Sequence, residues 1–119
     1  MTFPAENIRD WREHDVVDLH GDKVGSLEAV YFDTGSDEPV FASVRVGVLG
    51  RRRLVFVPLT DAVVAPSFVR VTAEKKLIKA APSIDVDGEL SSELESEVFA
   101  HYGLPYQPGD SGERRLGRR

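Results

Sequence analysis

The segment VFASVRVGV, residues 40–48, alternates one series of small or β-branched side chains with a second, mixed series. A repeat of two is the pattern of a β-strand that lays one face on a hydrophobic core. A second apolar run, LVFVPL at residues 54–59, follows a turn at residues 49–51. Together the two runs predict an antiparallel hairpin. The first strand should turn the following side chains toward the core: Val40, Ala42, Val44, Val46 and Val48.

Shorter runs of the same kind lie on both sides of this hairpin. Upstream, HGDKVGSLEAVYFD at residues 20–33 begins with a Gly-Asp turn and continues as a strand over residues 27–32. Further short strands are expected at residues 16–19, 63–64 and 68–71. Short strands separated by turn residues about every ten positions favour a small barrel or sandwich over a fold of alternating strands and helices. The predicted fold class is therefore mainly β.

Two helical segments are expected after the β region. TAEKKLIKAAP, residues 72–82, should begin at a Thr72 cap and end before Pro82. The second helix should begin at Ser92, whose hydroxyl can cap the backbone while Glu95 reaches back in a capping box. Gly103 is the expected residue beyond its last turn.

Composition limits the class of protein. The chain has 119 residues, of which 41% are hydrophobic, which suits one domain with a single modest core. It contains no apolar run near the ~20 residues that a membrane-spanning helix needs, and its first residues do not resemble a secretory signal. It has no cysteine, which excludes disulfides and thiolate metal sites. We therefore expect a cytoplasmic protein without a membrane anchor.

Charge is unevenly distributed along the chain. The net charge is −5, yet residues 107–119 hold four arginines and two acidic residues. The remainder keeps 11 of the 15 basic and 18 of the 20 acidic residues, close to −7, which makes a nucleic-acid partner unlikely on electrostatic grounds. We expect a β-barrel region with its lead-in at residues 1–82, an acidic linker and helix at residues 83–106, and a disordered basic tail at residues 107–119.

His101 is the histidine most closely surrounded by apolar residues. It falls in the last turn of the second predicted helix, on the same stripe as Leu94 and Val98. A histidine there can hydrogen-bond the terminal carbonyls and interact favourably with the helix dipole. A catalytic imidazole would need an orienting carboxylate and a nucleophile, and the sequence identifies neither. The structural interpretation is favoured: His101 helps to seat the helix.

Other candidates for chemistry are weaker. His14 and His20 lie among aspartates, and DVDGE at residues 85–89 resembles the start of a calcium loop. The first spacing matches no zinc pattern, and the second lacks the glycine and glutamate of an EF-hand at their positions. Motifs for phosphate loops, serine nucleophiles, zinc hydrolases and dinucleotides are also missing. We expect no enzymatic activity, no metal and no cofactor.

The order and spacing of the motifs resemble the PRC-barrel family. Its pattern is a G-x-x-[IV]-G-x-[IVL] turn and strand, an aspartate that closes this strand, and a Val-Pro pair near the end of the hairpin. The matching positions, within a region from about residue 7 to residue 71, are Gly21, Val24, Gly25, Leu27, Asp33, Val57 and Pro58. DGELSSELESEVFAHYGLPY, residues 87–106, is similar to the acidic segment and tyrosine-containing helix of the photosynthetic reaction-centre H subunit and of stand-alone bacterial relatives.

The resemblance implies a small six-stranded β-barrel followed by a short helix and a C-terminal helical segment. It also implies a role in assembly or binding, with no family-wide catalytic residues to transfer. We therefore predict a bacterial, non-enzymatic adaptor for a protein partner, with Tyr102 and Tyr106 as candidate contacts and homodimerisation through a strand edge as a further expectation. The alternative is a module that senses an anion or small molecule through Arg51, Arg52 and Arg53 at the hairpin tip.

Overall fold

Eight strands and two helices make up the part of the chain that the computed structural model describes, residues 14–36, 38–47, 52–86, 88, 90–104 and 116–118. The strands are β1 (Asp15–Val17), β2 (Lys23–Asp33), β3 (Pro39–Val46), β4 (Arg53–Pro58), β5 (Val63–Val64), β6 (Phe68–Arg70), β7 (Ser83–Asp85) and β8 (Leu116–Arg118). The helices are α1 (Lys75–Lys79) and α2 (Ser92–His101). The prediction of a mainly β fold is confirmed.

The three longest strands form the centre of the sheet. β3 pairs with β4 in antiparallel register, with Val44 opposite Val55, so the predicted hairpin is confirmed. β2 pairs with the other edge of β3, with Leu27 opposite Val44. The β2–β3 pairing is irregular at two points, between Leu27 and Ala29 and again between Tyr31 and Phe32. Such irregularities change which side chains face each side of a sheet.

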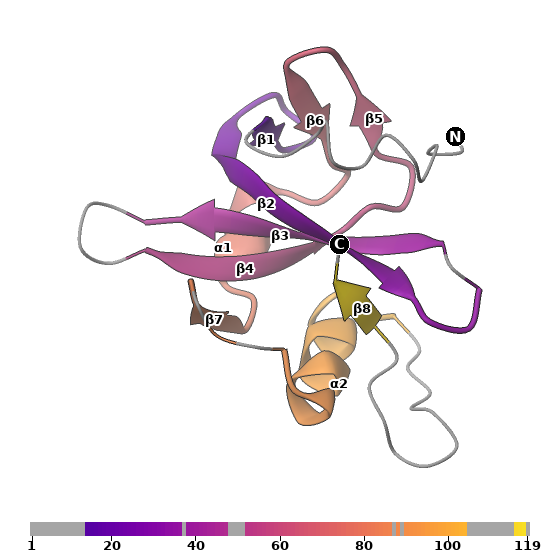
Figure 1. Cartoon of the computed structure of the whole chain (residues 1–119). Coiled ribbons are helices and arrows are strands. Elements are labelled where there is room, and N and C mark those ends of the chain that lie inside the picture. The colour runs from indigo at the N-terminus through magenta and orange to yellow at the C-terminus, as the bar shows by residue number, and fades with distance from the viewer. Residues whose placement is uncertain are drawn as a thin grey trace.

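The sheet is open rather than closed. Its strand order is β5-β6-β1-β2-β3-β4-β7, and β8 pairs with β2 outside this path. β1 and β6 are parallel, and the other neighbouring pairs are antiparallel. Among the described residues, the end strands β5 and β7 do not pair with each other. The expected six-stranded barrel is thus an open, curved sheet of eight described strands (Figure 1).

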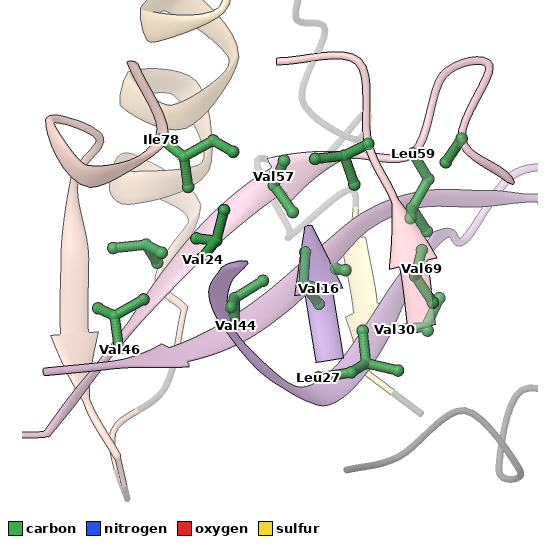
Figure 2. Close-up of a cluster of buried hydrophobic side chains, with 14 residues drawn as sticks. Val16, Val24, Leu27, Val30, Val44, Val46, Val57, Leu59, Val69 and Ile78 are labelled. Atoms are coloured by element: carbon green, nitrogen blue, oxygen red, sulfur yellow. The ribbon is translucent and has the colours of Figure 1, made fainter. Parts of the chain in front are cut away.

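Two hydrophobic clusters hold the sheet, one on each face. The first combines mostly branched aliphatic side chains of β1 to β4 and β6 with Ile78 of α1 (Figure 2). The second contains Phe41 and Phe56 from the sheet, Val98 and Phe99 from α2, and Leu116 from β8. Both faces of the hairpin are therefore buried, which a simple apolar and polar alternation does not predict.

The predicted core face of β3 is correct in its central part. Ala42, Val44 and Val46 belong to the first cluster. Val40 packs instead against the second cluster, next to the irregular pairing of β2 with β3. Val48 lies outside the described residues.

α1 begins later than predicted, and α2 begins at Ser92 as predicted but is capped by the preceding residue. α1 has Glu74 at its N-cap without a side-chain cap, while the Thr72 hydroxyl donates to the carbonyl oxygen of Thr60. The N-cap of α2 is Ser91, whose Oγ accepts a hydrogen bond from the Leu94 N–H at 3.2 Å. The predicted end of α2 is confirmed, because Gly103 lies just beyond the helix with a φ of +69°.

The predicted disorder of residues 107–119 is wrong for Leu116–Arg118, which form β8 beside α2 (Figure 1). Leu116 is 2% exposed and belongs to the second cluster. The prediction averaged composition over the whole tail, whereas a single leucine that enters a core can anchor a short strand. Residues 107–115 lie outside the described residues.

Candidate binding surfaces

The edge of β2 that faces away from β3 carries two short strands. β1 pairs with the first half of β2, and β8 pairs with Tyr31, Phe32 and Asp33 at its end. The partners in this antiparallel register are Arg118, Gly117 and Leu116, respectively. The second half of β2 is therefore an edge to which the fold adds an extended segment from a distant part of the chain.

Both the side chain and the backbone of Leu116 hold β8 at this edge. The side chain lies in the second cluster, and the N–H donates to Oε2 of Glu95 at 3.2 Å. Glu95 is fully buried, so its carboxylate has given up contact with water. A buried carboxylate needs hydrogen-bond donors to offset that loss, and the Leu116 N–H supplies one. Glu95 thus connects α2 to β8.

Gly117 lies where a side chain would crowd the ring of Phe32. A Cβ atom built at this position would lie 2.7 Å from Cζ of Phe32, closer than real Cβ contacts. The strand site on β2 therefore favours a large aliphatic residue followed by glycine.

α2 packs on the sheet next to this site through aromatic side chains. The Tyr102 hydroxyl donates to the Phe56 carbonyl oxygen at 2.6 Å, and burial raises the pKa of Tyr102. The rings of Phe41 and Phe99 meet edge to face with centroids 5.0 Å apart. His101 lies with Nε2 2.8 Å from the Leu77 carbonyl oxygen, which joins α2 to α1. Tyr102 is thus an internal anchor, and Tyr106 lies outside the described residues.

A second surface feature is a pocket of about 520 Å³ at the far end of β2 and β3. Residues of β2 and β3 form most of its lining, and four of the lining residues are cationic. We call this the basic pocket. Its cationic residues are Lys23, Arg45, Arg52 and Lys79.

The predicted arginine cluster divides between different environments. Arg52 lines the basic pocket. Arg53 begins β4 and donates from Nη1 to Oγ of Ser83 at 3.4 Å and from Nη2 to the Lys79 carbonyl oxygen at 3.3 Å. Arg51 lies outside the described residues. The structure thus brings Arg52 together with Lys23, Arg45 and Lys79, three cations that sequence reasoning missed because they are far apart along the chain.

The family-motif residues form the turn, the strand and the hairpin that support these surfaces. Gly21 has a φ of +85° in the turn after β1, a conformation that glycine adopts without strain. Asp33 ends β2 and accepts a hydrogen bond from the Gly35 N–H at 2.7 Å. The others lie in β2 or β4, and the apolar ones among them that enter the first cluster are Val24, Leu27 and Val57.

Gly25 and Pro58 have specific places in this frame. A Cβ atom at Gly25 would lie 2.2 Å from the Arg45 carbonyl oxygen, so β2 and β3 can approach this closely only because residue 25 is glycine. Pro58 is the last residue of β4 and lies opposite Phe41.

Asp18 is a buried carboxylate that the sequence did not single out. It is 2% exposed and accepts hydrogen bonds from the N–H groups of His20, Asp22 and Lys75 at 2.9, 2.9 and 3.0 Å. Loss of water raises the pKa of Asp18, but these three donors, Lys75 foremost, lower it by more, so the net pKa is below its ordinary value. Asp18 therefore ties the β1–β2 turn to the start of α1.

Among the described residues, no three histidine, aspartate or glutamate side chains gather in a way that could hold a metal ion. Neither described helix is long and apolar enough to cross a membrane.

Comparison with models of protein families identifies a domain in this chain. The family model for the PRC-barrel domain matches residues 4–78, which is 75 of the 119 residues. No curated protein matches the chain. The matched region ends inside α1, so α2 and β8, which cover the second face of the sheet, lie beyond it.

Proposed function

Because the chain belongs to the PRC-barrel domain family, we propose that it is a non-enzymatic cytoplasmic adaptor that binds a protein partner by strand addition. The partner contributes an extended segment to the edge of β2 at Tyr31–Asp33, in place of β8. The observation that carries this proposal is the occupation of that edge by a three-residue segment with a buried leucine and a glycine that lies against the ring of Phe32.

Strand addition is a common way to recognise peptides. Main-chain hydrogen bonds give affinity, and pockets for individual side chains give specificity. Here the leucine site in the second cluster and the ring of Phe32 beside Gly117 set the specificity. The expected partner segment therefore has a large aliphatic residue followed by glycine, with basic residues near it as in RRLGRR at residues 114–119.

β8 is short enough to be displaced by a longer partner segment. Burial of one leucine side chain contributes about 1.5–3 kcal/mol. Ordering three backbone residues costs about 3–6 kcal/mol, and each hydrogen bond returns about 0.5–1.5 kcal/mol. A partner strand that extends further along β2 or α2 adds contacts without losing those that β8 makes.

The test uses the full chain with Leu116→Glu. A glutamate there would bring a charge into the second hydrophobic cluster, so β8 should leave its site while the rest of the fold remains. A fluorescent RRLGRR peptide should then bind, and the unmodified chain should bind it at least about tenfold more weakly because its own β8 competes at high effective concentration.

The control peptide is RRLVRR, which has the same charge and places a Cβ atom against Phe32. It should bind clearly more weakly than RRLGRR. Because Leu116→Glu could disturb the fold, Gly117→Val serves as a second releasing variant, and circular dichroism checks both. If folded variants bind neither peptide, or bind both equally, the strand-addition proposal is wrong.

A further inference from the structure

The basic pocket is a separate site whose charge contrasts with that of the chain. The chain has five more acidic than basic residues, yet none of the described residues that line the pocket is acidic. Its four cations come from four separate segments: β2, β3, the residue before β4, and the last residue of α1. Folding therefore collects positive charge at one place on an otherwise acidic protein.

The paired backbones of β2 and β3 form a rigid support for the cationic residues of these two strands. β2 and β3 approach so closely at Gly25 that no Cβ atom fits against the Arg45 carbonyl. In the register of these strands, Ser26 lies opposite Arg45. Gly47, with a φ of +108°, then lets the chain leave β3 beside the pocket. The close strand contact keeps Lys23 and Arg45 at one end of the same rigid pair of strands.

Arg53 does not line the basic pocket, but it holds the backbone of Lys79, which does. Its guanidinium bonds to the Lys79 carbonyl and to Ser83, so it holds the end of α1 near the start of β4. Lys23 has an ion pair with Asp15 at 3.2 Å, but both side chains are more than half exposed, so the pair is weak and readily exchanged for a ligand.

We propose that the basic pocket binds a small molecule that carries two or more phosphate groups. Two arginines offer planar, bidentate donors that match phosphate oxygens, and two lysines add compact charges. Four cations exceed what a single monoanion can neutralise. The volume of about 520 Å³ lies in the range of pockets that bind small molecules. The proposed anion site therefore lies at the start of β2 and the ends of β3 and α1, and not at the hairpin tip where the sequence placed it.

Calorimetric titration with pyrophosphate tests the proposal on the full chain and on Arg45→Gln and Arg52→Gln. Each variant should weaken binding by about tenfold or more. Lys76→Gln is the matched control, because Lys76 lies in α1 but does not line the basic pocket. It should change the affinity less than about twofold, and thermal melts verify that all variants fold.

Two further titrants define the ligand class. Citrate should bind more weakly than pyrophosphate, and a short single-stranded RNA should not bind more tightly than pyrophosphate. The proposal is overturned if the parent chain does not bind pyrophosphate, or if Lys76→Gln loses as much affinity as the arginine variants. Tighter binding of citrate or of RNA, lost in the arginine variants, would also overturn it by assigning the pocket to carboxylates or to nucleic acid.

Discussion

Replacement of Leu116 by alanine tests whether β8 belongs to the hydrophobic core. The side chain is 2% exposed, and its removal takes away most of the apolar contact that β8 makes with the second cluster. Leu→Ala changes in protein cores cost about 2–5 kcal/mol. The cost here cannot exceed the free energy with which β8 docks, because beyond that point the strand simply detaches. We therefore expect a loss of about 1.5–3 kcal/mol in the free energy of unfolding.

Urea unfolding monitored by circular dichroism measures this loss. Leu19→Ala is the matched control, because Leu19 is 44% exposed and its truncation should cost less than about 0.5 kcal/mol. A Leu116→Ala loss within about 0.5 kcal/mol of the control would show that β8 is not docked in solution. The strand site on β2 would then lack the occupant on which the proposed function rests.

Three further perturbations test other parts of the account. Tyr102→Phe removes the hydroxyl bonded to the Phe56 carbonyl and should lower the free energy of unfolding by about 0.5–1.5 kcal/mol in the same urea assay. The pKa of Asp18 is lowered in the folded state. The ionised carboxylate should therefore stabilise the fold above the ordinary carboxyl pKa, and this stabilisation should disappear as the pH falls through the pKa of folded Asp18. Urea midpoints across this acidic range should therefore fall more steeply for the parent chain than for Asp18→Asn, and parallel curves would contradict the assignment. Gly25→Ala should cost at least about 2 kcal/mol, because its Cβ would meet the Arg45 carbonyl, and a neutral result would refute the close strand contact.

The features that local sequence determines were predicted well. The period of two in residues 40–48 and the apolar run after it predicted the β3–β4 hairpin, because adjacent strands joined by a short turn need only local information. Gly103 predicted the end of α2 for the same reason, since a positive φ at that position favours glycine. The family motifs also agreed with the match to the PRC-barrel domain.

The features that depend on distant parts of the chain were missed. Burial of both faces of β3 requires α2 and β8, which follow it by about half the chain. Glu95 accepts a hydrogen bond from the Leu116 N–H of β8, which a local motif cannot reveal. The four cations of the basic pocket stand in separate segments, so sequence reasoning saw only the adjacent arginines and assigned them to the hairpin tip.

Chemical-shift mapping of the RRLGRR peptide on the Leu116→Glu chain tests the central claim most directly. The account predicts that the largest amide changes occur at Tyr31, Phe32 and Asp33 of β2 and at Glu95 of α2, the residues that hold β8 in the unmodified chain. Changes that RRLVRR reproduces in full would show that the site does not select glycine. Changes scattered over other parts of the chain would show that the peptide binds by charge alone. That result would contradict the claim that the edge of β2 is a site for strand addition.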